Sequence, residues 1–232
     1  MAPRPGLRSD LTPSVGITST PIYDPSTGTV YLVALVNDGP NVGEPHMYLY
    51  ALDAQTGAVQ WRVMIQGSPV NSPGGTFDAL SERQRTGLLL VNGTVYMGFA
   101  SYCDYRTYVG YVAGVSTTTK ALTLWSDEAG LTDTDGGIWQ SGSGLMSDGN
   151  GRIFFTSGNG VSPAAGPGGR PPQELGDSTV RLSVGSGGVL SSADCGRAHV
   201  RAAQPREVQR DFTRRGRRPA RFRRAQRRRG NT

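Results

Sequence analysis

Hydrophobic positions in residues 1–194 come in short runs of β-branched and aromatic residues, separated by turns rich in Gly, Pro, Asn and Asp. No stretch of a dozen residues repeats its apolar positions at the 3.6-residue period of an amphipathic helix. Short runs bounded by turn residues are typical of strands. The first four runs predict strands over Gly16–Tyr23, Thr29–Leu35, Met47–Asp53 and Val59–Ile65. The pattern therefore predicts an all-β fold.

One turn-and-strand unit occurs three times, as PSTGTVYLVAL, LVNGTVYMGFA and SDGNGRIFFTS. The shared glycines of these units, Gly28, Gly93 and Gly151, stand 65 and 58 residues apart, and a second strand-sized segment follows each unit. Four strands within a period of roughly 60 residues are what the blade of a β-propeller requires. Tandem β-sandwich domains would give similar spacing, so the periodicity alone leaves both architectures open.

The turn after the third predicted strand carries the most specific motif. The sequence ALDAQTGAVQW fits the pattern A-x-D-x-x-T-G-x-x-x-W, with Ala51, Asp53, Thr56, Gly57 and Trp61 at the fixed positions. Gly57 can adopt the positive φ of a tight turn. The side chains of Asp53 and Thr56 can bond the backbone of the turn. Trp61 is predicted to lay its apolar face on the next blade, which makes the motif a structural blade-docking motif.

With this motif and the three repeated units, residues 14–194 resemble the quinoprotein-like, or pyrroloquinoline-quinone-like (PQQ-like), β-propeller repeat family of bacterial secreted proteins. The resemblance implies a partial β-propeller of four-stranded antiparallel blades, about two and a half to three of them. Propellers of this family have more blades, so the chain is interpreted as a fragment. The second unit keeps Trp125 but has Ser116 near the aspartate position and no Thr-Gly pair, so we expect its turn to be less well fixed.

PQQ and calcium are implied as cofactors only by the family resemblance. Dehydrogenases of the family hold PQQ and calcium with carboxylate and amide ligands and often cover the quinone with a disulfide between adjacent cysteines, whereas Cys103 and Cys195 are far apart here. The acidic residues of the repeats lie beside Gly, Pro or Ser, where bonding of the local backbone is their usual role. We therefore expect a scaffold or binding role with no supported catalysis and name no catalytic, cofactor-binding or metal-binding residue. A fragment of a PQQ-dependent dehydrogenase remains the alternative.

The net charge of +6 hides two unlike segments. Residues 1–194 hold 10 basic and 16 acidic side chains, whereas residues 195–232 hold 14 arginines and only two acids. Residues 1–13 are expected to be a disordered N-terminus and residues 195–232 a disordered Arg-rich tail. Arg, Ala, Gly and Pro dominate this tail, which is typical of a GC-rich gene read out of frame, so the tail is interpreted as a frameshift product. If the tail is genuine, nucleic-acid binding is a further alternative, because arginines bind phosphates.

Location and partners are predicted only coarsely. The apolar runs are too short to cross a bilayer, and no apolar stretch of a signal peptide follows the first residues. The family resemblance implies an extracytoplasmic or secreted protein. The partner is not identified, but an incomplete propeller leaves blade faces and strand edges uncovered, so we expect self-association.

Overall fold

The structure is a computed structural model that describes residues 15–41, 43–102, 107–164, 166–167 and 172–192. The chain divides into two compact units, Met1–Arg201 and Ala202–Thr232, and every described residue belongs to the first. The predicted disordered N-terminus at residues 1–13 and the predicted Arg-rich tail at residues 195–232 lie outside the described residues. Both therefore stay predictions.

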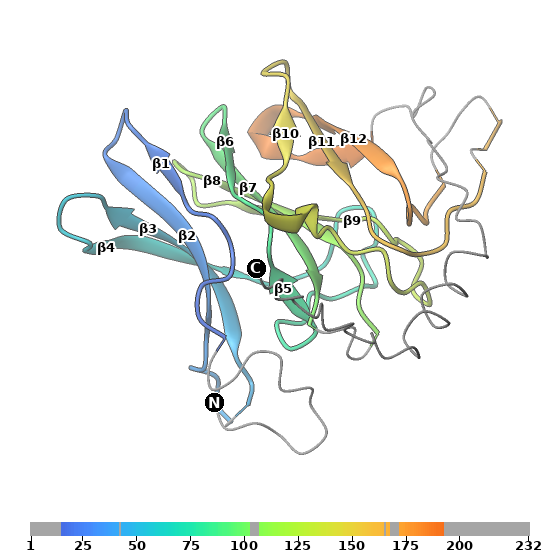
Figure 1. Cartoon of the computed structure of the whole chain (residues 1–232), viewed down its shortest axis with the longest axis horizontal. Helices are drawn as coiled ribbons and strands as arrows, with labels where there is room; N and C mark the ends of the chain where they lie inside the picture. Colours follow the sequence, from blue (N-terminus) through green and yellow to red (C-terminus); the bar gives the residue numbers. More distant parts are fainter. Residues whose placement is uncertain (1–14, 42, 103–106, 165, 168–171, 193–232) are drawn as a thin grey trace, which may run out of the picture. The chain divides into compact units, whose positions relative to one another are not determined.

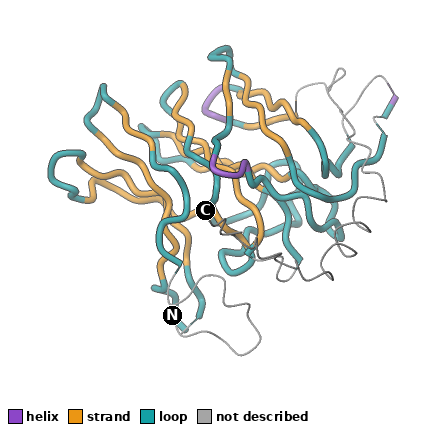
Figure 2. Tube along the Cα trace, viewed as in Figure 1, coloured by secondary structure: helices purple, strands orange, loops and turns teal. Residues whose placement is uncertain are grey.

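All strands of the described residues lie in three antiparallel sheets, and no α-helix occurs among these residues (Figures 1 and 2). Blade 1 consists of β1 (Ile22–Asp24), β2 (Thr29–Val36), β3 (His46–Asp53) and β4 (Val59–Ile65). Blade 2 consists of β5 (Glu82–Gln84), β6 (Leu89–Val91), β7 (Thr94–Ser101), β8 (Tyr111–Ser116) and β9 (Leu122–Ser126). Blade 3 consists of β10 (Met146–Ser147), β11 (Arg152–Thr156), β12 (Thr179–Val184) and β13 (Leu190–Ser192). Short 3-10 turns occur in the described residues at η2 (Gln140–Gly142) and η4 (Ser186–Gly188). The all-β partial propeller is confirmed.

Blade 2 has five strands instead of the expected four because its first strand is broken in two. Strands β5 and β6 both pair with β7, β5 beside one half of it and β6 beside the other. At the break, the hydroxyl of Thr86 accepts a hydrogen bond from the N–H of Gly98 at 2.9 Å. The side chain of Thr86 thus takes the place of a backbone group in the ladder, and the two short strands fill one strand position.

The first strand of blade 1 is shorter than predicted, since β1 begins at Ile22 and not at Gly16. The residues before it bond to the next blade instead. The hydroxyl of Thr18 donates to the carbonyl of Gln84 at 2.7 Å, and the carbonyl of Thr20 accepts from the N–H of Leu88 at 3.1 Å. The prediction was wrong here because a local apolar pattern does not reveal which backbone will supply the hydrogen-bond partners.

The same kind of join links blade 2 to blade 3. Gly87 forms a parallel bridge with Gly144, and the N–H of Gly87 donates to the carbonyl of Ser143 at 2.9 Å. A Cβ atom on Gly144 would lie 3.0 Å from the carbonyl oxygen of Gly87. The first-strand regions of all three blades are therefore joined by backbone contacts, and glycine permits the close approach between the second and third.

Two hydrophobic cores lie between the blades. The first core packs one face of blade 1, including Tyr31 and Leu49, against one face of blade 2, including Met97. The second core packs the opposite face of blade 2, including Tyr96 and Trp125, against blade 3. Strand β7 alternates between the two cores, and its burial on both faces holds the blades in sequence.

Trp125 is the largest side chain in the second core, with 1% of its surface exposed and an edge-to-face contact with Phe155 at 5.9 Å between ring centroids. We expect Trp125→Ala to lower the free energy of unfolding by about 3–5 kcal/mol, the usual cost of removing a buried large aromatic. Trp61 is only partly buried against the first core, so Trp61→Ala should cost about 2 kcal/mol. Urea unfolding of both variants measures the difference.

Val59→Ala is the control, because 57% of Val59 is exposed and its truncation should change stability by less than about 0.5 kcal/mol. Equal losses for Trp61→Ala and Trp125→Ala would contradict the difference in packing.

Candidate functional site

The motif residues of blade 1 form the tight turn between β3 and β4. One carboxylate oxygen of Asp53 accepts hydrogen bonds from the N–H of Gln55 at 3.0 Å, the N–H of Thr56 at 2.8 Å and the hydroxyl of Thr56 at 2.8 Å. The hydroxyl and N–H of Thr56 thereby lower the pKa of Asp53. Gly57 lies at φ +73°, and no atom comes within 4 Å of the position of a Cβ there.

Ala51 and Trp61 lie opposite each other in the register of β3 and β4, with an irregularity just after Ala51. The Trp61 ring packs beside Tyr31 at 5.7 Å between centroids. On the blade 2 side, the ammonium of Lys120 lies 4.0 Å from the centroid of the Trp61 ring. This placement puts Trp61 at the boundary of the two blades, while its contribution to docking stays a prediction.

The matching turn of blade 2 uses weaker groups in the same places. The hydroxyl of Ser116 accepts from the N–H of Thr119 at 3.1 Å, where Asp53 accepts three hydrogen bonds. Lys120 takes the position of Gly57 and has a φ of +63°, which is unfavourable for a residue with a Cβ. Its pKa is lowered by desolvation. Lys120 thus combines an unfavourable turn conformation with the contact to Trp61.

A polar pocket of about 340 Å³ opens at one end of blade 2. Its walls come from three connections: β4 to β5, β7 to β8, and β9 to β10. Among the described residues, the acids that line it are Asp78, Glu82, Glu128 and Asp133, and no described Lys, Arg or His does so. None of these four acids was named as a site residue from the sequence.

Two of the lining carboxyls are buried without full hydrogen bonding. Glu82 is 1% exposed and its Oε2 atom has no hydrogen-bond partner. Glu128 is 2% exposed, and neither of its carboxyl oxygens has a hydrogen-bond partner of good geometry, although the N–H of Gly176 is near enough to oppose the rise of its pKa. Burial raises the pKa of Glu82 well above its ordinary value, with a smaller opposing effect from the N–H of Val109. Burial and the neighbouring acids raise the pKa of Glu128 to about 9.

A third buried carboxyl, Asp127, lies just behind the pocket wall. It is fully buried, and one oxygen accepts from the N–H of Gly110 at 2.7 Å. A Cβ on Gly110 would come within 2.3 Å of the Asp127 carboxylate, and one on Gly136 within 2.9 Å. Glycine backbone therefore encloses this side chain, and burial raises its pKa to about 7.

The family resemblance implies a calcium ion, but the described residues do not form a set of ligands for it. No group of three or more His, Cys, Asp or Glu side chains in these ranges lies close enough to hold a metal ion. Asp133 and Asp148 bond their own turns: Asp133 accepts from the N–H of Gly130 at 2.6 Å and Asp148 from the N–H of Asn150 at 2.9 Å.

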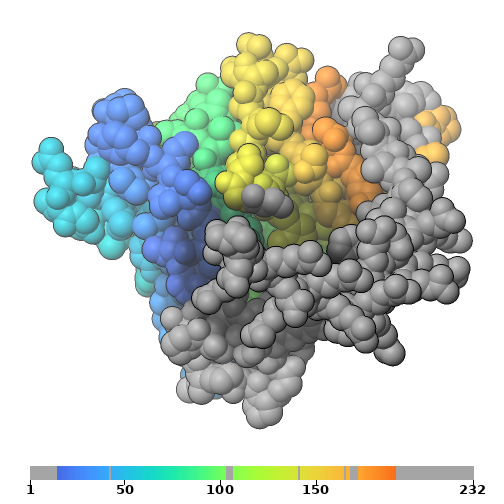
Figure 3. Space-filling view, viewed as in Figure 1, coloured from blue at the N-terminus to red at the C-terminus, as the bar shows by residue number. Residues whose placement is uncertain are grey.

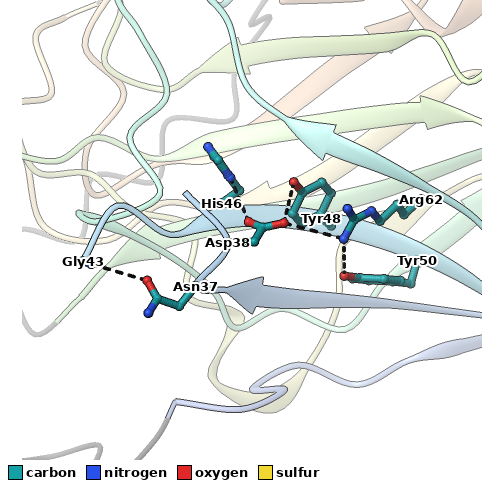
Figure 4. A network of polar contacts seen from close by, with 7 residues as sticks. All are labelled: Asn37, Asp38, Gly43, His46, Tyr48, Tyr50 and Arg62. Carbon is teal, nitrogen blue, oxygen red and sulfur yellow. Dashed lines mark hydrogen bonds and ion pairs between the residues drawn. The ribbon is translucent and has the colours of Figure 1, made fainter. Parts of the chain in front are cut away.

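A second polar cluster lies on the face of blade 1 that points away from blade 2 (Figure 4). Asp38 contacts Nδ1 of His46 at 2.8 Å and accepts from the hydroxyl of Tyr48 at 3.0 Å. Arg62 donates to the hydroxyl of Tyr50 at 3.2 Å, and its guanidinium lies 4.3 Å from the centroid of the Tyr48 ring. His46 and Tyr48 lower the pKa of Asp38.

Comparison with known proteins supplies little beyond this geometry. No family model matches the chain, and no characterised sequence matches it. Among solved structures, the quinohemoprotein alcohol dehydrogenase ADHIIG from Pseudomonas putida HK5 is similar over 72% of this chain, with 18% identity and a TM-score of 0.46. This chain covers 24% of that protein. The propeller assignment therefore rests on the three sheets themselves.

Gly57→Ala should lower the free energy of unfolding by about 1 kcal/mol, because alanine is strained at φ +73°. The loss should not be larger, since the position of the new methyl group is unoccupied. Thermal or urea unfolding measures it. Gly185→Ala is a matched control, because the Cβ position at Gly185 meets only the carbonyl oxygen of Val189 at 3.6 Å and its φ of −81° suits alanine. A similar loss for both variants would contradict the assignment of strain to Gly57.

The buried carboxyls predict an unusual pH dependence of stability. Their folded-state pKa values lie above the ordinary values of 3.8 and 4.5, so the folded protein holds protons that the unfolded chain releases. The resulting stabilisation is fully present below those ordinary values and is lost as the pH rises through about 7 and 9. We expect the urea midpoint to fall between pH 5 and pH 9, with a flatter slope in Asp127→Asn.

Glu44→Gln, a change at an exposed acid of blade 1, is the control for that slope. A midpoint that rises from pH 5 to pH 9 would show that the buried acids are ionised and compensated in the folded state.

Proposed function

We propose that the chain is the blade-forming part of a longer PQQ-like β-propeller and that it serves as a scaffold or binding module with no supported catalysis. The observation that supports this most directly is the difference between the two faces of blade 1. On the face toward blade 2, Tyr31, Val33 and Leu49 are at most 3% exposed. On the opposite face, Tyr23 is 54% exposed and Val59 57%. A blade with one such open face can take up further β-structure.

The open face of blade 1 has the composition of a protein interface. The register of the sheet places the following residues on it: Tyr23, Val30, Leu32, Ala34, Tyr48, Tyr50, Leu52, Val59, Arg62 and Met64. Of these, Tyr48 is only 5% exposed, and the Arg62 guanidinium lies over its ring. Tyrosine and arginine are enriched in interface cores, where their apolar area combines with polar groups. In Figure 3, blade 1 forms one flank of the view in blue and cyan, beside the green of blade 2. We propose that a further blade covers this face, and that a second copy does so when the chain is alone.

The remaining parts of the proposal come from the family resemblance. It implies an extracytoplasmic or secreted location. Among the described residues, no helix has the length and apolar character needed to cross a membrane. The dehydrogenase alternative has PQQ as its cofactor. The nucleic-acid alternative depends on the tail at residues 195–232, outside the described residues.

Self-association tests the open face. We expect the purified full chain to form oligomers whose mass increases between about 1 and 100 μM, as seen by sedimentation velocity, because a large apolar face favours association. Leu32→Lys should shift the population toward monomer, because it places a charge in the centre of the face. Val189→Lys, at an exposed residue of blade 3, is the control and should leave the mass distribution unchanged.

A monodisperse monomer over that concentration range would contradict the proposed face. The enzyme alternative has its own test: PQQ with calcium is added to the full chain. An unchanged quinone absorption spectrum and melting temperature would support the scaffold, and a saturable spectral change would favour the alternative.

A further inference from the structure

The second strand position of each blade repeats the same short sequence, so the three blades can be compared residue by residue. Strands β2, β7 and β11 follow the shared glycines Gly28, Gly93 and Gly151. Side chains alternate between the two faces of a strand. Counted from each glycine, the second and fourth residues therefore lie on one face of the blade, and the third residue lies on the other.

The second and fourth positions face the preceding blade in both blades that have one in the structure. In blade 2 these residues are Val95 and Met97, and they lie in the core shared with blade 1. In blade 3 they are Ile153 and Phe155, and they lie in the core shared with blade 2. This face is thus the one with which a blade receives its predecessor.

The third position faces the following blade. Tyr31 of blade 1 lies in the core shared with blade 2, and Tyr96 of blade 2 lies in the core shared with blade 3. Both joints therefore place the third-position face of one blade on the second- and fourth-position face of the next blade. Neither joint brings together two faces of the same kind.

One half of such a joint remains at each end of the described blades, which lie on either side of blade 2 (Figure 1). Blade 1 has Val30 and Leu32 at the second and fourth positions of its open face, and both are only partly buried. Blade 3 has Phe154 at the third position, with Met146 and Arg181 beside it in the register. Met146 is 57% exposed, and neither core of the described residues includes Phe154. We call the surface of these three residues the outward face of blade 3.

We propose that the chain, when it is alone, associates head to tail: the outward face of blade 3 in one copy packs on the open face of blade 1 in another. This contact has the same two halves as the joints within the chain, so it repeats a packing that the sequence already makes twice. Because the two faces differ, the contact is heterologous, and it leaves one face of each kind for a further copy. The inference rests on the proposed open face of blade 1 and adds the surface that covers it.

A symmetric contact between two blade 1 faces is the alternative. It would place Leu32 of one copy against second- and fourth-position residues of the other, a combination that neither joint of the chain contains. The symmetric contact would also leave the outward face of blade 3 outside the interface. The two modes therefore predict different responses to a change in blade 3.

Sedimentation velocity of full-length variants at about 1–100 μM distinguishes the two modes. Leu32→Lys blocks the face of blade 1, and Phe154→Lys blocks the face of blade 3. Each variant alone should be mainly monomeric, with its dissociation constant raised at least about tenfold, because an unpaired charge is buried in the contact. An equimolar mixture should form pairs that stop at two chains, because each variant keeps the face that the other has lost.

Met146→Lys is a second change on blade 3 that spares the cores, since 57% of Met146 is exposed. It should restore pairing with Leu32→Lys in the same way as Phe154→Lys. Val189→Lys, at an exposed residue that is part of neither face, should associate as the unaltered chain does. Melting curves establish beforehand that each variant is folded.

The inference is overturned if the folded blade 3 variants associate as the unaltered chain does, or if their mixtures with Leu32→Lys stay monomeric. The open face of blade 1 survives either result as long as Leu32→Lys alone weakens association. If Leu32→Lys associates as the unaltered chain does, or if the unaltered chain is a monomer at every concentration, the open face itself is contradicted and the head-to-tail contact is excluded with it.

Discussion

Strand β7 is buried along its whole length, and this burial on both faces is the constraint on which the other parts of the structure depend. A strand that faces solvent on one side can alternate apolar and polar residues, but a strand between two packed sheets must be compatible with both. Val95, Met97 and Phe99 point into the first core, and Tyr96 points into the second. One face of blade 2 therefore packs against blade 1, and its other face packs against blade 3.

Close packing on both faces also explains why small residues interrupt the strands of blade 2. A Cβ on Gly114 would lie 2.7 Å from the ring of Tyr96, so β8 leaves space for an aromatic side chain of β7. Thr86 follows the same principle at the broken first strand, where its hydroxyl replaces a ladder group opposite Gly98. The space gained at Gly114 is filled by the ring of Tyr96, which is 1% exposed.

Much of blade 1 could be predicted from its sequence, because its signals are local. The predicted Val59–Ile65 matches β4, and the strands predicted at Thr29–Leu35 and Met47–Asp53 differ from β2 and β3 by one residue each. The short β1 and the division of β5 from β6 could not be predicted, since both depend on hydrogen bonds between blades. The pocket was missed for a related reason. Asp127 and Glu128 follow directly after the apolar β9, which was the only sign that these acids would be buried and not form an exposed turn.

The connections between the blades have two roles: they join neighbouring blades, and they form the walls of the acidic pocket. In the connection from β4 to β5, the N–H of Val70 donates to the carbonyl of Leu124, which lies within β9. The side chain of Asn71 bonds the backbone N–H and carbonyl of Ser126 at the end of β9. These bonds cover the outer edge of blade 2. The connection after β9 is tied in turn to blade 3, where the N–H of Leu175 donates to the carbonyl of Asp127. Each connection therefore anchors one blade to the next and also forms a wall of the acidic pocket. Because both tasks use the same backbone, the carboxyls are held in place by the contacts that join the blades, and their burial follows from the assembly of the blades.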